Sequence, residues 1–176
     1  IILIGDSQSV EPIGHYEIVE TILAFLEKFK VKEIITLAGL NVGEVVEKPR
    51  VIGAVNDLEM VKKYKNHGID FEAGSKIGTI VGAAGLFLGL GKIRGMKGIC
   101  LLGETAGFPI LTDPKAGEAV LKILMKILDL DISLEKLDRR VKEMENFLQK
   151  IEKIQQQALK QISQEKSDED ELRYIG

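Results

Sequence analysis

The sequence predicts an α/β fold, specifically a three-layer α/β sandwich with a mainly parallel sheet, followed by a long C-terminal amphipathic helix. Two observations predict it. Apolar, strand-like runs alternate with amphipathic stretches, and a narrow apolar stripe then continues for about 30 residues. The 176 residues are 45% hydrophobic and 29% charged, which is typical of one compact domain with an appendage.

The expected strands and helices follow one another along the first three quarters of the chain. The expected strands are residues 1–5, 32–38, 51–55 and 96–103. Amphipathic helices are expected at residues 14–30 and 58–67, and a further helix is opened by Asp113 and Pro114. Asp57 and Asp113 are of the residue type that caps a helix N-terminus. Because helices separate the strands, we expect right-handed crossovers and parallel pairing.

The first four residues are all apolar and have no initiator Met. This indicates that the chain begins inside a fold, although a processed or vector-derived start would look the same. We therefore divide the chain into three parts. Residues 1–129 form an α/β core that lacks its N-terminal part, residues 130–165 form a long oligomerisation helix, and residues 166–176 form an acidic tail with an apolar docking end.

The oligomerisation helix is predicted from apolar residues at spacings of three and four, with charged residues between them. These residues are Leu134, Leu137, Val141, Met144, Leu148, Ile151 and Ile154. A narrow stripe of this length needs a helical partner, as in a coiled coil. The partner is expected to be the same helix of another copy, and the alternatives are a second helical protein or this chain's own sheet. The candidate partner-binding tail comprises Leu172, Tyr174, Ile175 and Gly176.

Several classes of function are disfavoured. The net charge of −3 and the lack of a basic stripe argue against nucleic acid, and the longest apolar stretch is too short to span a bilayer. The two histidines are far apart, so no metal site is expected. Cys100 is the single cysteine and lies in an apolar run, which favours a reducing cytoplasm. We expect no nucleophile, no cofactor and no enzymatic activity.

A glycine-rich segment, residues 74–95, has neither the P-loop nor the dinucleotide-binding spacing. Its glycines recur every three to four residues, which predicts one small-residue face on a buried helix. The glycines of that face are Gly78, Gly82, Gly85 and Gly89.

One candidate pocket stands at the end of an expected strand. Glu104 and Thr105 follow Gly103 on the side where open α/β sheets bind ligands. The same stretch also fits a plain loop that connects the strand to the next helix, because Asp113 is of the residue type that caps that helix.

Three segments together resemble the archaeal proteasome assembly chaperone family. They are Thr36-Leu37-Ala38-Gly39, the glycine-rich stretch 78–91, and Leu101-Leu102-Gly103-Glu104-Thr105 running to Asp113-Pro114. The resemblance implies an α/β sandwich and ATP-independent action. It also implies homo-oligomers that dock on the α-subunits of the proteasome core particle through C-terminal tails.

The tail departs from the pattern of proteasome activators, which end in a hydrophobic residue, Tyr and any residue. Here Tyr174 is third from the end, and Arg173 separates it from Leu172. The tail then binds differently, or the true terminus lies further on, or the tail does not dock. The alternatives to proteasome assembly or activation are a scaffold that pairs with another protein through its long helix, and a phosphorylase- or hydrolase-like enzyme that uses Glu104.

Overall fold

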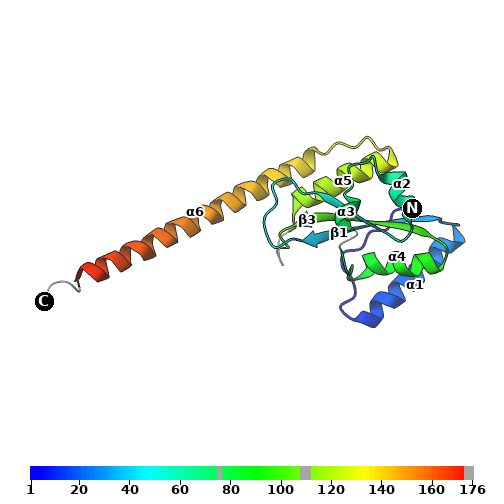
Figure 1. Cartoon of the computed structure of the whole chain (residues 1–176), viewed down its shortest axis with the longest axis horizontal. Helices are drawn as coiled ribbons and strands as arrows, with labels where there is room; N and C mark the ends of the chain where they lie inside the picture. The colour runs from blue at the N-terminus through cyan, green and yellow to red at the C-terminus, as the bar shows by residue number, and fades with distance from the viewer. Residues whose placement is uncertain (75–76, 108–111, 173–176) are drawn as a thin grey trace. The chain divides into compact units, whose positions relative to one another are not determined.

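The structure is a computed structural model that describes residues 1–74, 77–107 and 112–172, with side chains as far as residue 154 apart from residue 152. The chain divides into two compact units, Ile1–Ile132 and Ser133–Gly176. The first unit contains the sheet (Figure 1). The elements in order are α1 (Pro12–Lys28), β1 (Glu33–Asn41), β2 (Val51–Val55), α2 (Leu58–Tyr64), α3 (Phe71–Gly74), α4 (Ala83–Ile93), β3 (Lys97–Thr105), α5 (Pro114–Leu128) and α6 (Glu135–Leu172).

The described strands form a sheet in the order β1-β3-β2. β1 is parallel to β3 with Thr36 opposite Cys100, whereas β2 is antiparallel to β3 with Ala54 opposite Cys100. The expectation of a mainly parallel sheet is therefore wrong, because this sheet is mixed. No helix lies between β1 and β2, and a return in the same direction needs a long crossover, so β2 runs back against the other two strands.

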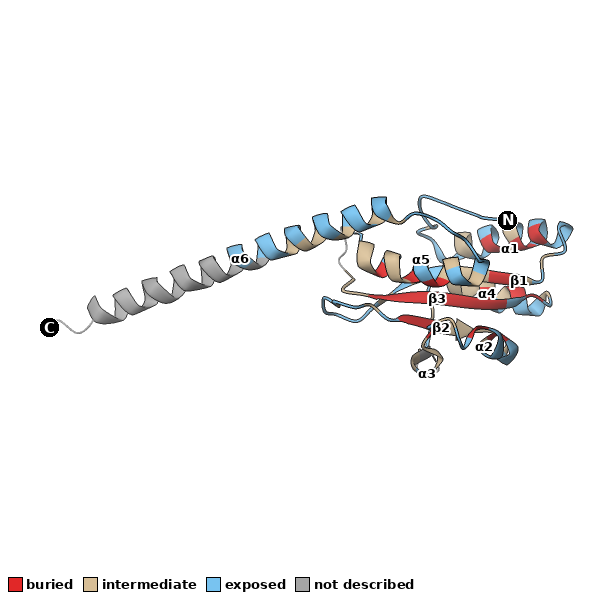
Figure 2. Cartoon of the chain, turned by 90° about the horizontal axis from the view of Figure 1, so that it is seen from above, coloured by how far each residue is buried: buried red, intermediate tan, exposed pale blue. Residues whose placement is uncertain are grey.

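Helices cover both faces of the central strand β3, as the red core in Figure 2 shows. Successive side chains of a strand point to opposite faces, so Ile99 and Leu101 belong to one cluster and Cys100 and Leu102 to the other. The first cluster is completed from α2 and α5 by Met60, Tyr64, Val120 and Ile123. On the second face α4 packs against β1 and β3, and α1 packs against α4.

Two helix starts are confirmed as predicted. Asp57 caps α2 by accepting a 2.8 Å hydrogen bond from the Glu59 amide. Asp113 caps α5, where Pro114 is the first helical residue. In both cases a carboxylate accepts from amides that the first helical turn leaves without a partner, so the boundary is set by local sequence.

The glycine-rich segment differs from the expectation of one continuous glycine face. Helix α4 begins only at Ala83, so Gly78 and Gly82 precede it. Gly82 has φ +86°, and a Cβ there would lie 2.5 Å from Gln8 Oε1. A Cβ on Gly85 would lie 2.3 Å from the carbonyl oxygen of Ile80. Gly82 is required by its positive φ and Gly85 by the close approach of the Ile80 carbonyl, whereas a Cβ on Gly89 would meet no atom within 4 Å, so the expected close-packed glycine face is not formed.

The strand expected at residues 1–5 is not formed in this structure. The segment is irregular, and its four apolar side chains are 53 to 91% exposed. Helix α1 begins at Pro12, seven positions after Gly5, and its residues Val19 and Leu23 are fully buried. The start of the described chain therefore exposes apolar surface.

Candidate functional site

The two candidate pocket residues, Glu104 and Thr105, lie at the end of β3 and belong to opposite faces of the sheet. Glu104 is 5% exposed and is the one buried charged residue among those described. Thr105 is half-buried and lines a cavity on the other side. The structure therefore separates the pair that the sequence grouped together.

The carboxylate of Glu104 is held by Arg50, which directly precedes β2. Arg50 Nε donates to Oε1 at 3.0 Å and to Oε2 at 3.1 Å. Arg50 Nη2 also donates to Oε1. The backbone amide of Arg50 donates to Oε2 at 3.0 Å. These hydrogen bonds hold the pKa of Glu104 below its ordinary value. A carboxylate so engaged is a weak base, which disfavours a catalytic role for Glu104.

Asp70 joins this cluster from the loop before α3. Its Oδ2 accepts from Arg50 at 3.1 Å, and its Oδ1 accepts from the Ala73 amide at 2.8 Å. Sequence reasoning missed Arg50 and Asp70. They lie 54 and 34 positions from Glu104, and no spacing rule connects residues that only the sheet brings together.

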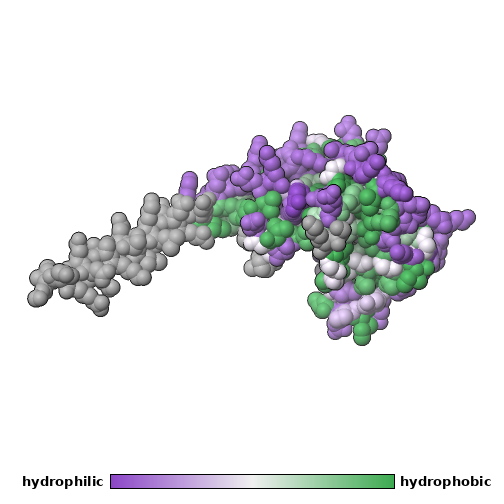
Figure 3. Space-filling model, viewed as in Figure 1, coloured by the Kyte–Doolittle hydropathy of each residue, from purple (hydrophilic) through white to green (hydrophobic). Residues whose placement is uncertain are grey.

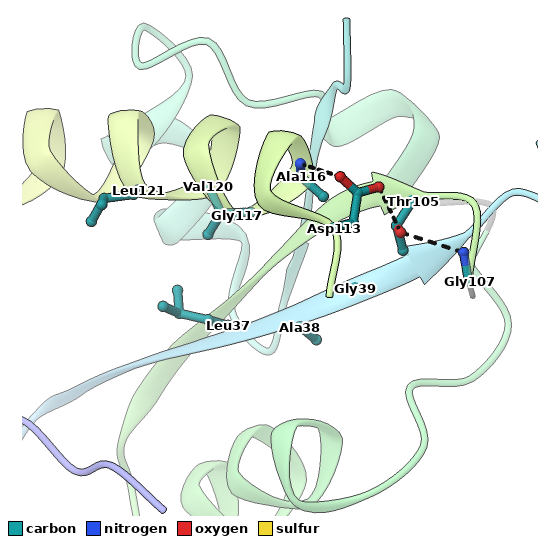
Figure 4. A pocket seen from close by; sticks show the side chains of 10 residues that line it. All are labelled: Leu37, Ala38, Gly39, Thr105, Gly107, Asp113, Ala116, Gly117, Val120 and Leu121. Carbon is teal, nitrogen blue, oxygen red and sulfur yellow. Dashed lines mark hydrogen bonds between the residues drawn. The ribbon is translucent and has the colours of Figure 1, made fainter. Parts of the chain in front are cut away.

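Thr105 lines an apolar cavity of 460 Å³ between β1, the end of β3 and α5 (Figure 4). Its walls are mainly small and apolar side chains, with Asp113 and Gly107 at one end. The lining residues are Leu37, Ala38, Gly39, Thr105, Gly107, Asp113, Ala116, Gly117, Val120 and Leu121. A Cβ on Gly117 would meet no atom within 4 Å, so the α5 wall is open at that point.

The polar groups of this cavity are bonded to one another. Asp113 Oδ2 accepts from Thr105 Oγ1 at 2.8 Å, while Asp113 Oδ1 accepts from the amides of Lys115 and Ala116 at 3.1 Å each. The Gly107 amide donates to Thr105 Oγ1 at 3.3 Å. The described side chains include no buried polar atom without a partner. The cavity therefore offers chiefly apolar contact.

The predicted oligomerisation residues follow one another along α6, apart from Leu134, which directly precedes it. Ile151 is 36% exposed and Ile154 is 63% exposed, while the five residues before them are half-buried. Figure 3 shows hydrophobic residues along one side of the described part of α6 and hydrophilic residues along the other. An apolar helix side with exposed isoleucines is able to pack against a partner helix.

Of the candidate tail residues, Leu172 is the last residue of α6. Tyr174, Ile175 and Gly176 lie outside the described residues. Within the described part of the chain, no cluster of three or more His, Cys, Asp or Glu side chains has an arrangement suited to a metal ion. None of the helices in the described part of the chain is long and apolar enough to cross a bilayer.

Taken together, the described residues define an α/β protein with a small mixed sheet, helices packed on it and several exposed apolar side chains. The model of the PAC2 family matches residues 1–152, and the chain belongs to the PAC2 family. The resemblance found from the sequence motifs is confirmed by this match and by the solved structures.

Two Pyrococcus furiosus proteins have similar structures. PbaB, described as an archaeal proteasome activator, is 43% identical with a TM-score of 0.76 over 84% of this chain. PbaA, described as an archaeal homolog of proteasome-assembly chaperone, is 30% identical with a TM-score of 0.69 over 82% of this chain. This chain spans 63% of the PbaB chain and 62% of the PbaA chain, less than two thirds of either.

A relative from Methanocaldococcus jannaschii, the uncharacterized protein MJ1210, is 40% identical over all 176 residues of this chain and 67% of its own length. The sequence likeness thus extends through the region of α6.

Proposed function

We propose that this chain acts as a homo-oligomeric, ATP-independent proteasome assembly chaperone or activator. In this proposal it docks on the α-subunits of the proteasome core particle through residues 172–176. The observation that carries the proposal is the 43% identity and TM-score of 0.76 to PbaB, described as an archaeal proteasome activator. We place this activity in the cytoplasm and require no cofactor for it.

Assembly through α6 is supported by the composition of that helix. Met144 and Leu148 are half-buried and Ile154 is 63% exposed, so an apolar side remains available to a coiled-coil partner. Self-association would display several tails on one particle. Several weak contacts to neighbouring α-subunits then give a useful affinity through avidity.

Action by binding, without catalysis, is supported by the state of the best catalytic candidate. Glu104 is buried and its carboxylate accepts hydrogen bonds from Arg50, and the polar groups of the cavity at Thr105 are hydrogen-bonded to one another.

Within this proposal we assign a role to each of three parts of the chain: a three-layer α/β core over residues 1–129, an oligomerisation helix over 130–165, and an acidic docking tail over 166–176.

The test is native mass spectrometry of the protein alone and mixed with an archaeal proteasome core particle. A variant lacking residues 172–176 is compared with the full chain, and Ser167→Ala in the acidic tract serves as the matched control. We expect an oligomer that binds the core particle, binding by the Ser167→Ala control, and loss of binding on deletion. Binding that survives the deletion would refute docking through residues 172–176.

A scaffold that pairs with another helical protein is the second candidate function. The observation that favours it is the position of Tyr174, which is out of register with the pattern of activator tails. An oligomer that ignores the core particle in the same experiment would favour the scaffold.

A further inference from the structure

The ends of two helices lie beside the starts of two strands at one end of the sheet. The Lys97 amide at the start of β3 donates to the carbonyl of Lys32, which directly precedes β1, at 2.9 Å. α1 packs against α4, and the guanidinium of Arg94, just after α4, donates to Glu27 of α1 at 2.7 Å. Figure 1 shows these two helices side by side. The fold therefore brings together two segments, 27–33 and 92–97, that are far apart in the sequence.

Four lysines at this end of the sheet leave it with an excess of positive charge. We call them the basic edge, and they are Lys28, Lys30, Lys32 and Lys92. All four are exposed, and none forms an ion pair with another described residue. Other cations nearby are paired with acidic side chains, namely Lys63 with Glu33, Lys97 with Glu59, and Arg94 with Glu20 and Glu27. A surface with unpaired lysines attracts an acidic partner.

Lys30 occupies a backbone position that favours glycine. It is the second residue after the end of α1 and has φ +54°. The corresponding residue after α4 is Gly95, with φ +73°. A left-handed conformation disfavours residues that carry a Cβ, so glycine at position 30 would avoid a backbone cost. The lysine is retained against this local preference, which points to a role for its charge on the surface.

Exposed apolar side chains accompany the basic edge. Phe29 is 58% exposed beside Lys30, and Ile93 is 82% exposed beside Lys92. This combination fits a peptide segment in which acidic residues are followed by an apolar one, because charge attraction and apolar contact then act together. A phosphate backbone fits less well, since it carries no apolar side chain and is repelled by the acidic members of the neighbouring ion pairs.

The chain itself contains a segment of this composition. Four consecutive acidic residues, 168–171, form an acidic tract that Leu172 follows directly. The tract lies at the far end of α6, whose 38 residues extend for about 57 Å. A compact unit the size of Ile1–Ile132 is about 36 Å across. Because the helix is longer than such a unit is wide, we take the tract of a second copy as the occupant.

We propose that the basic edge binds the acidic tract of a second copy of this chain, with Leu172 against Phe29 and Ile93. The four acidic side chains match the four unpaired lysines in number. The contact is heterologous, because the tract of one copy meets the basic edge of another. It does not depend on proteasome binding, and its test uses no core particle.

Fluorescence anisotropy of a labelled peptide of residues 163–176 tests the proposal on the full-length chain. The receptor is a variant whose own tract is neutralised by Asp168→Asn, Glu169→Gln, Asp170→Asn and Glu171→Gln. We expect this variant to bind the peptide, and the wild type to bind it at least about tenfold more weakly because its own tracts occupy the basic edges. Added NaCl should weaken the binding, since it screens exposed charges. Equal binding by the two chains, or binding that NaCl leaves unchanged, would overturn the proposal.

Lysine variants locate the binding surface. In the chain with the neutralised tract, Lys30→Gln with Lys92→Gln should weaken peptide binding by at least about tenfold. The matched control is Lys48→Gln with Lys122→Gln, which removes the same charge from exposed lysines in the loop after β1 and in α5. The control should keep the affinity, and circular dichroism checks that both variants are folded. An equal loss in the control would show that the overall charge, and not the basic edge, decides binding.

A charge exchange keeps the test decisive whatever the stability of one variant. Lys30→Glu with Lys92→Glu should release the original peptide and bind a peptide that carries lysine at positions 168–171. Failure of this exchange in a folded variant would overturn the proposal. A single-stranded oligothymidylate is the remaining probe. If it binds the basic edge more tightly than the peptide does, the edge is a nucleic-acid surface and the proposal is wrong.

Discussion

Arg50 surrounds the carboxylate of Glu104 with hydrogen bonds from both its guanidinium and its own backbone amide, across the antiparallel pair of β2 and β3. The side chain of Glu104 is 7% exposed, whereas the Arg50 side chain is 60% exposed. The arginine therefore keeps contact with water while it satisfies a buried charge. This relationship explains how a carboxylate is tolerated at the end of the central strand.

The variant Glu104→Gln should lower the free energy of unfolding by about 2 kcal/mol. A neutral amide loses charge-assisted hydrogen bonds from Arg50 and brings its own donors toward those of the arginine. Urea unfolding at pH 7 measures the loss. Glu59→Gln is the control, because the pair of Glu59 and Lys97 is exposed and its loss should change the stability much less. Equal effects of the two variants would contradict a special role for Glu104.

The stabilisation by Glu104 should depend on pH. Arg50 lowers the pKa of Glu104 below its ordinary value of 4.5 in the folded chain, so the unfolded chain takes up the proton first as the pH falls. The contribution is complete above about pH 4.5 and is lost as the pH falls through the lowered pKa. The stability difference between wild type and Glu104→Gln should therefore be smaller at pH 3 than at pH 7. A difference that stays constant over this range would contradict the assignment.

Asp113→Ala should destabilise the chain by about 1 to 2 kcal/mol. The substitution removes the cap of α5, and Thr105 loses the acceptor of its hydroxyl. Thermal unfolding monitored by circular dichroism measures the effect. Asp131→Ala replaces an exposed aspartate beyond the end of the same helix and should have little effect. A loss of similar size in both variants would indicate a general charge effect.

The thiol of Cys100 should be unreactive in the folded protein. Cys100 is 0% exposed, and burial raises the pKa of its thiol, so little thiolate forms at neutral pH. A colorimetric thiol reagent should label it slowly in buffer and rapidly in concentrated urea. Rapid labelling in buffer would show that the core opens readily around β3.

Assembly through α6 should depend on one side of that helix. The double variant Met144→Asp with Leu148→Asp places charges within the predicted apolar stripe and should dissociate the oligomer. Asn146→Asp introduces the same side chain at an exposed position on the opposite side of the helix. Sedimentation equilibrium measures the mass of each variant. An oligomer that survives the double variant would exclude this stripe as the interface.

Local sequence patterns predicted the elements well where the cause was itself local. The strand at Val51–Val55 has the predicted bounds, and Asp57 and Asp113 open the predicted helices. Short-range hydrogen bonds and side-chain alternation are sufficient for these features. The glycine-rich segment was predicted less well. The start of α4 depends on a positive φ at Gly82 and on the hydrogen bond from the Ala83 amide to Gln8, 75 positions away.

The sequence by itself determined the strand at Val51–Val55, the helix caps and the resemblance to archaeal proteasome assembly chaperones, because residues within a few positions, or motifs in fixed order, decide them. The tertiary structure alone decided that β2 is antiparallel and that Glu104 pairs with Arg50 while Thr105 faces an apolar cavity. Strand order and partners across the sheet arise from burial of the whole apolar surface at once. No local spacing rule contains that information.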